Sequence, residues 1–289
     1  MRRFDFYRPT ALTEVASLFQ QHGEGGTLLA GGTDILVQMK EAGRTARYVV
    51  SLSGLPDLEG ISGGGGAPLR IGARTLVADV AAHPEVRAHY PALADGASII
   101  GSVQTRNLAT IGGNVCNAAP SADTSPALAV YEATVQTMSA SGGRTIPIND
   151  FWTGPGRTVL EPGEVVTHIE LPVRPARSSS HYQRHTPRKV MDIAAVGTAV
   201  YLELDESGAC TTARVALGAV APTVIRAPKT EAALVGQTIN EDSAAAAAKV
   251  AATEATPISD QRASAEFRTY LIEVMTKQSI LEAERRASA

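Results

Sequence analysis

Two glycine pairs dominate the interpretation of this chain: Leu28–Asp34 has the sequence Leu-Leu-Ala-Gly-Gly-Thr-Asp, and Ala109–Asn117 has Ala-Thr-Ile-Gly-Gly-Asn-Val-Cys-Asn. Each pair follows an apolar or β-branched run and lacks side chains where a backbone could approach a bound anion. Backbone N–H groups that point inward in such turns attract phosphate. We therefore expect the two turns to grip one diphosphate, which predicts a dinucleotide ligand.

Length, composition and charge narrow the class of protein. The 289 residues, of which 44% are hydrophobic, suffice for about two globular domains. A net charge of -3 gives no concentrated basic face for nucleic acid, and no apolar run is long enough to cross a bilayer. The chain opens without a signal peptide, so we expect a soluble, cytoplasmic protein with no membrane span.

Cysteine usage argues against a metal centre in this chain. Cys116 and Cys210 are too few for an iron-sulfur cluster and lack the paired spacing of a zinc site. We predict no metal ligands here and assign any metal redox chemistry to another chain.

Residues 1–56 are predicted to form a small α/β unit. Thr10 is the expected N-cap of a helix that Gly23 ends. A strand over 27–30 then enters the first glycine turn, and a helix over 34–40 and a strand over 48–52 follow. This order suits a phosphate held at a helix N-terminus.

Two further regions follow. Residues 57–175 mix strands and helices and are predicted to form a second, α+β unit that contains the other glycine turn. Within it we predict a hairpin of two strands, over 134–138 and 144–148, and a helical stretch over 78–100 with breaks at Pro84 and Pro91. Residues 176–289 are predicted to form a C-terminal domain with a long hairpin around 205–208 and two helices, over 243–253 and from 260 toward 286. We attribute the alanine-rich run of the first helix to helix propensity and the apolar stripe of the second, Phe267, Leu271, Val274, Gln278 and Leu281, to intramolecular packing.

Polar side chains near the turns are the candidate ligand contacts. Thr33 offers a hydroxyl, whereas the Asp34 carboxylate is expected to cap its helix and turn away from phosphate. After the second turn, a polar run supplies donors and acceptors for ribityl or ribose hydroxyls, namely Asn114, Asn117, Ser121, Asp123 and Thr124. Two alternatives stay open at this level: a glycine pair can be an ordinary tight turn, and Asp123 can be a helix N-cap.

Four motifs in order resemble those of a known family. They are residues 30–34, residues 110–114 with Asp123 nine residues later, the stretch 164–172, and the stretch 182–194. In this order they resemble the FAD-binding subunit of molybdenum hydroxylases, a group that includes the medium subunit of aerobic carbon monoxide dehydrogenase and the flavin part of xanthine dehydrogenase. The resemblance covers essentially the whole chain.

The resemblance implies an α+β fold: a two-part FAD-binding domain of the vanillyl-alcohol-oxidase (PCMH) type, followed by a C-terminal α+β domain with a three-stranded antiparallel sheet and a helical bundle. It implies noncovalently bound FAD, with the diphosphate on the two turns, Asp123 on a hydroxyl-bearing part and Val166 near the isoalloxazine. The cofactor-binding residues expected on this basis are Leu29, Ala30, Gly31, Gly32, Thr33, Asp34, Ile35, Thr110, Ile111, Gly112, Gly113, Asn114, Asn117, Asp123, Val166 and Arg184.

Two positions bear on how the flavin is tuned and covered. Arg184 matches a place where the family often has lysine, and a cation there would stabilise reduced, anionic flavin. The basic stretch 171–191 around it can also be a solvated loop. Ile193 occupies a position at which the resemblance implies a tyrosine against the flavin in carbon monoxide enzymes. This difference argues against carbon monoxide as the substrate.

The function implied is that of an electron-transfer subunit without catalytic residues toward the organic substrate. A large partner would carry molybdopterin and a small partner two [2Fe-2S] clusters, in a complex expected to be a dimer of heterotrimers. FAD would pass electrons to NAD+, a quinone, oxygen or another acceptor. The alternatives are a self-contained FAD/NADPH reductase similar to enolpyruvylglucosamine reductase, and a nonenzymatic nucleotide-binding protein.

Overall fold

The computed structural model describes all 289 residues, and it begins with a three-stranded parallel sheet. The strand order is β1-β3-β2, from β1 (Asp5–Tyr7), β2 (Gly26–Leu29) and β3 (Tyr48–Ser51). Helix α1 (Leu12–His22) packs Val15, Leu18 and Phe19 with Tyr48 and Val50. Helix α2 (Ile35–Lys40) connects β2 to β3, so the first glycine turn lies between a strand and a helix as predicted.

The middle of the chain forms a five-stranded antiparallel sheet of order β4-β5-β10-β6-β7. Its strands are β4 (Ile61–Gly64), β5 (Ala67–Gly72), β6 (Thr134–Met138), β7 (Thr145–Pro147) and β10 (Val165–Leu171). The predicted hairpin of β6 and β7 is confirmed. Two short strands, β8 (Trp152–Gly154) and β9 (Arg157–Thr158), pair separately.

Short helices cover one face of this sheet and enclose the largest hydrophobic core. The predicted breaks at Pro84 and Pro91 are confirmed, because each proline begins a new helix. The helices are α3 (Val77–Ala82), α4 (Pro84–His89), α5 (Pro91–Ser98), α6 (Val103–Arg106), α7 (Ile111–Asn117) and α8 (Ser125–Val130), and short 3-10 turns span Leu52–Gly54, Pro56–Leu58 and Ile148–Asp150.

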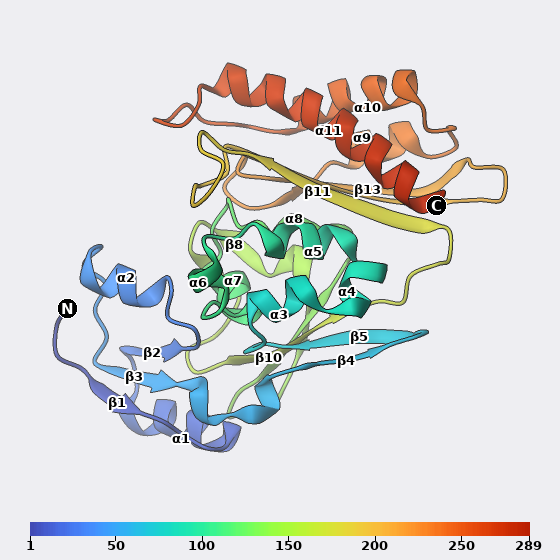
Figure 1. The fold of residues 1–289 in the computed structure, drawn as a ribbon. Coiled ribbons are helices and arrows are strands. Elements are labelled where there is room, and N and C mark those ends of the chain that lie inside the picture. Colours follow the sequence, from blue (N-terminus) through green and yellow to red (C-terminus); the bar gives the residue numbers. More distant parts are fainter.

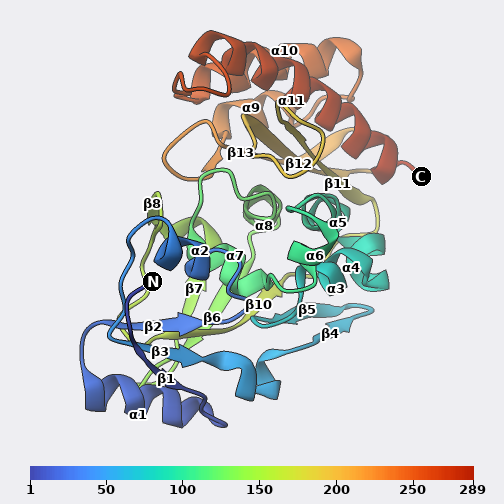
Figure 2. The same cartoon turned by 60° about the vertical axis from the view of Figure 1, so that its left-hand side comes forward.

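The C-terminal part is a four-stranded antiparallel sheet covered by helices on both faces (Figures 1 and 2). Its order is β11-β12-β13-β14, from β11 (Ser178–His185), β12 (Val196–Leu204), β13 (Cys210–Gly218) and β14 (Ile225–Arg226). Helices α9 (Pro228–Leu234), α10 (Glu241–Glu254) and α11 (Ala265–Ala287) form the outer layer. Helices α5 and α8 of the middle part contact the opposite side.

Several sequence expectations need correction in this part. The sheet has a two-residue fourth strand, β14, beyond the three expected. The alanines of α10 do more than favour a helix, because Ala244, Ala247, Ala248 and Ala251 form a fully buried face. The predicted stripe of α11 is correct only in part: Leu271 is buried and Leu281 packs against the core, whereas Phe267 is 44% exposed. The buried face also contains Arg268, Ile272, Met275 and Ser279.

The start of α1 also differs from the prediction. Ala11, not Thr10, is the N-cap, and no side chain caps the helix. Thr10 instead donates its N–H and hydroxyl to the Glu14 carboxylate. Gly23 does end the helix, in a left-handed conformation with φ of 65° that glycine adopts without strain. None of the helices is both long and apolar enough to span a bilayer.

Candidate functional site

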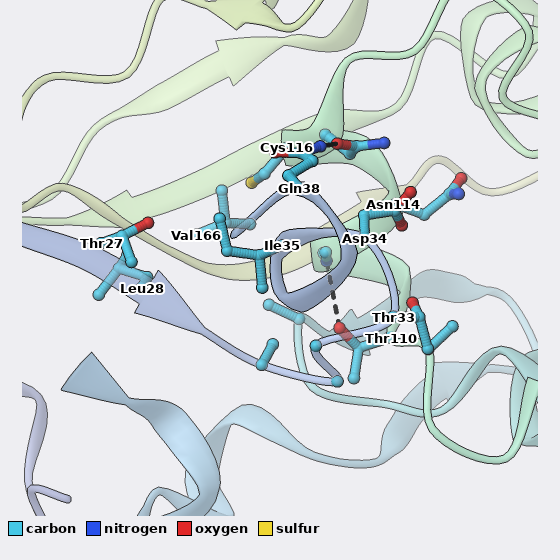
Figure 3. A pocket seen from close by; sticks show the side chains of 18 of the residues that line it. Thr27, Leu28, Thr33, Asp34, Ile35, Gln38, Thr110, Asn114, Cys116 and Val166 are labelled. Carbon is cyan, nitrogen blue, oxygen red and sulfur yellow. Dashed lines mark hydrogen bonds between the residues drawn. The ribbon is translucent and has the colours of Figure 1, made fainter. Parts of the chain in front are cut away.

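A cavity of about 750 Å³ lies where the two glycine turns meet, and both turns line it. Figure 3 shows side chains of the two turns around this space, with Val166 of β10 among them. Of the residues expected at the site, all except Leu29, Ile111 and Thr124 line the cavity. Thr124 is buried and donates its hydroxyl to Asn114 Oδ1. Ile111 is fully buried in the hydrophobic core, and Leu29 belongs to β2. The structure therefore brings the two turns to one site.

The first turn presents unused hydrogen-bond donors. The backbone N–H groups of Gly31 through Ile35 donate to no atom of the chain, although all these residues line the cavity. Gly32 has a φ of 78°, which is the left-handed conformation that lets successive N–H groups converge. A run of converging, unpartnered N–H groups is typical of a site for an anion such as phosphate.

The second turn contributes a smooth wall rather than donors. Its N–H groups are already engaged: Ile111 donates to Thr75 O at 3.0 Å, Gly112 to Ala73 O at 2.9 Å and Gly113 to Thr110 Oγ1 at 3.2 Å. A Cβ on Gly112 would come within 2.7 Å of Ala73, so this glycine is needed for packing. A Cβ on Gly113 would meet only Thr110 Oγ1, at 2.9 Å, so this glycine keeps the cavity wall bare.

The two turns also contact one another directly. A Cβ on Gly31 would lie 1.9 Å from the carbonyl oxygen of Leu108, so only glycine allows this close approach. At the far ends of the two helices, Gln38 Nε2 of α2 donates to Asn117 Oδ1 of α7 at 3.1 Å. Arg44 donates to Gln38 Oε1 at 2.8 Å, which fixes the orientation of the Gln38 amide. Both residues of the bridge line the cavity.

Asp123 is not a helix cap. Thr124 is the N-cap of α8, whereas Asp123 accepts a hydrogen bond from Tyr182 Oη at 2.8 Å and forms an ion pair with Arg184. Burial raises the pKa of Asp123 to about 6, and the Arg184 charge offsets part of that rise. The carboxylate is thus held by two residues of β11 at the cavity wall.

Arg184, the cation expected beside the flavin, lies at the cavity wall in an ion pair. Its guanidinium pairs with Asp123 and donates to Ile99 O at 2.9 Å, and its side chain is 7% exposed. Its positive charge is therefore largely balanced within the protein. The idea of a solvated basic loop is wrong for 178–185, which form strand β11.

Asp34 does not cap α2, contrary to the expectation. It occupies the N-cap position, but its side chain makes no capping hydrogen bond. Burial raises the pKa of Asp34, and a hydrogen bond with Thr33 partly offsets this.

Glu164 belongs to the 164–172 motif, but the motif does not indicate its hydrogen-bond partners, Arg144 and Thr137. It accepts from Arg144 Nε and Nη2, both at 2.7 Å, and from Thr137 Oγ1 at 2.6 Å. The Arg144 hydrogen bonds lower the pKa of Glu164 to about 2. This network fixes the 161–164 turn, which lines the cavity and whose Gly163 lies against Phe19 of α1. No sequence pattern pairs Arg144 with Glu164 across a separation of 20 residues.

Comparison with known proteins agrees with this geometry. The family model described as FAD binding domain in molybdopterin dehydrogenase matches residues 2–174, and that of the CO dehydrogenase flavoprotein C-terminal domain matches 180–283. The chain is 36% identical over 285 residues to the xanthine dehydrogenase FAD-binding subunit of Escherichia coli O157:H7, covering 97% of each. It is 32% identical over 279 residues to the carbon monoxide dehydrogenase medium chain of Hydrogenophaga pseudoflava, covering 96% of each.

Solved structures show the same architecture. Carbon monoxide dehydrogenase from Hydrogenophaga pseudoflava superposes with a TM-score of 0.93 at 32% identity, covering 99% of this chain and 98% of that one. Quinoline 2-oxidoreductase from Pseudomonas putida 86 superposes with a TM-score of 0.93 at 29% identity, covering 100% of this chain and 99% of that one. The fold and the cavity define a flavoprotein subunit of molybdenum-containing dehydrogenase complexes. The chain belongs to the FAD-binding medium subunits of the molybdenum hydroxylases, of the xanthine dehydrogenase and carbon monoxide dehydrogenase type.

Proposed function

We propose that this chain holds FAD noncovalently in the cavity between the two glycine turns and relays electrons from a partner subunit to an external acceptor. The observation that carries the proposal is the run of unpartnered N–H groups from Gly31 to Ile35, which matches the donors that a diphosphate requires. The bare wall at Gly113 supports it by leaving room on the opposite side. The cavity volume is within the range of cofactor sites.

The remaining walls suit the rest of the dinucleotide. Asn114 and Asn117 offer amides toward ribityl or ribose hydroxyls. Ile35, Val166 and Ile193 supply apolar surface for an aromatic ring system. FAD supplies transfer of either one or two electrons, which suits a junction between iron-sulfur clusters and a two-electron acceptor. The protein's own residues then only bind, orient and electrostatically tune the cofactor.

The side chains present support noncovalent attachment. The cavity lining contains no histidine and a single cysteine, Cys116. Burial raises the pKa of the Cys116 thiol to about 12, so it stays protonated and is a poor nucleophile toward the flavin.

The partners are proposed from the family. Relatives are described as medium chains, which supports assembly with a molybdopterin-binding large subunit and a small subunit with [2Fe-2S] clusters. We propose that the complex is a dimer of heterotrimers and that its electron acceptor is NAD+, a quinone, oxygen or another oxidant. We also propose that the domains of this chain span residues 1–56, 57–175 and 176–289. The hydroxylated substrate would bind to the large subunit, so this chain carries no residues that select it.

Purification of the tagged chain with its native partners tests the proposal. We expect FAD, identified by chromatography after acid release, together with molybdenum and iron in the complex. Addition of a reducing substrate of the complex should bleach the flavin only when the iron-sulfur subunit is present, whereas photoreduction should bleach it in the isolated chain as well. A chain that turns over alone with NADPH and a small substrate would instead be a self-contained reductase, and a chain that retains no flavin would be a nucleotide-binding protein of another kind.

A further inference from the structure

Arg268 of α11 lies outside the cavity and yet contacts two segments that lead into its walls. The side chain is 3% exposed, and its guanidinium donates to the carbonyl oxygens of Ala195 and, at 3.1 Å, Ala219. Asp260 accepts from its Nη2 at 2.7 Å and balances its charge. Because Asp260 balances its charge, this buried arginine affects its surroundings by fixing the positions of the two carbonyl groups rather than by its net charge.

The first segment is the connection from β11 to β12. It starts at His185, directly after Arg184, and closes where Ala195 N–H donates to His185 O at 2.8 Å. Asp192 and Ile193 of this connection line the cavity. Arg268 holds Ala195 O, which is two residues beyond Ile193, and so fixes the base of this wall.

The second segment leads into the cavity wall formed by Ser121, Ala122 and Asp123. Ala219 has a φ of 64°, a left-handed conformation that is unfavourable for any residue with a Cβ. Its N–H donates to Pro120 O at 2.7 Å, and its carbonyl accepts from Arg268. Ser121, Ala122 and Asp123, which follow Pro120, all line the cavity. Such strained residues persist where their surroundings over-determine them, and here Arg268 and Pro120 do so.

We propose that Arg268 is a positioning residue for the flavin site, through which the C-terminal domain sets the Asp192–Ile193 and Ser121–Asp123 walls. Burial of a guanidinium whose Nε has no hydrogen-bond partner is costly, and an apolar side chain of similar volume is often more stable at such a position. The hydrogen bonds to Ala195 O and Ala219 O give Arg268 a role in positioning these two carbonyl groups. The inference rests on the proposed FAD site.

The variants Arg268→Met and Arg268→Lys test this in the intact complex, by FAD titration and by visible circular dichroism of the flavin. We expect Arg268→Met to weaken FAD binding at least tenfold and to change the flavin spectrum, and Arg268→Lys to restore part of both. Arg226→Met is the matched control, because Arg226 is a partly buried, ion-paired arginine of the same domain that does not line the cavity. It should leave the FAD affinity within twofold of wild type.

Two further measurements separate positioning from simple loss of stability. Addition of Ala219→Gly to Arg268→Met should recover part of the FAD affinity, since glycine keeps the left-handed conformation without the guanidinium, whereas Ala195 O still lacks its donor. Amide hydrogen exchange should rise at 119–123 and 186–195 in Arg268→Lys whether or not FAD is bound. FAD affinity and exchange unchanged in Arg268→Lys would overturn the inference even if Arg268→Met fails to fold. Wild-type protein without FAD would instead refute the proposed function.

Discussion

Asp123 and Arg184 form a buried ion pair across two parts of the chain, with side chains that are 6% and 7% exposed. Asp123 precedes α8 of the middle part, and Arg184 belongs to β11 of the C-terminal sheet. Both residues line the cavity. The pair therefore joins the C-terminal sheet to the middle part at the candidate flavin site.

Removal of either partner should destabilise the fold. Arg184→Met leaves the Asp123 carboxylate buried without its cation, and the expected loss of unfolding free energy is about 3 kcal/mol. Asp123→Asn should cost a similar amount, and the double variant should lose clearly less than the sum. Urea denaturation of the four proteins measures this coupling, and strictly additive losses would contradict the ion pair.

The Glu164 network predicts a specific acid sensitivity. The pKa of Glu164 is about 2 in the folded chain against an ordinary value of 4.5, so the ionised carboxylate stabilises the fold fully above about pH 4.5. This contribution is lost as the pH falls from 4.5 toward 2. Because Arg144 is 46% exposed, solvent screening limits it to roughly 1–3 kcal/mol.

Urea denaturation of wild type and Glu164→Gln between pH 7 and pH 3 checks this expectation. The difference in unfolding free energy should be constant at neutral pH and shrink as the pH falls below 4.5. A difference that stays the same, or grows, at low pH would show that the Glu164 charge is not stabilised in the fold.

Local sequence patterns predicted the elements whose causes are local. The helix breaks at Pro84 and Pro91 follow from the missing N–H of proline, and the end of α1 follows from the freedom of Gly23. The β12–β13 hairpin followed from its alternation and turn residues. These features depend on neighbours in the chain, so a single sequence suffices to find them.

Features that depend on distant residues were out of reach. The stretch 178–185 has serine and basic residues typical of a loop, and its pairing with β12 makes it a strand. Asp123 resembled a cap because its partners, Tyr182 and Arg184, lie about sixty residues away. The sequence shows the glycines of the cavity wall, but only the three-dimensional structure separates Gly31 and Gly112, whose Cβ would meet backbone atoms, from Gly113, whose Cβ would meet only Thr110 Oγ1.

Substitutions in the two turns should therefore act differently. Gly113→Val places a side chain against the bound diphosphate and should abolish FAD retention with little loss of stability, since its Cβ meets only Thr110 Oγ1. Gly31→Ala forces the backbone away from Leu108 O and should also lower the unfolding free energy by about 1–3 kcal/mol. Flavin absorbance per protein and thermal unfolding distinguish the two effects. Full flavin occupancy in Gly113→Val would remove this turn from the site.

The Gln38–Asn117 bridge should set how long the cofactor stays bound. It joins α2 to α7 at the end of the two helices opposite the glycine turns, so its loss frees the two halves of the cavity to separate. One partly buried hydrogen bond is worth about 1 kcal/mol, so Gln38→Leu should release FAD about fivefold faster. Asn117→Leu should release FAD at least as fast, because it also removes an amide from the cavity wall, and the double variant should be no faster than Asn117→Leu alone. Stopped-flow fluorescence of released FAD measures these rates, and multiplied effects in the double variant would show that the two side chains act separately.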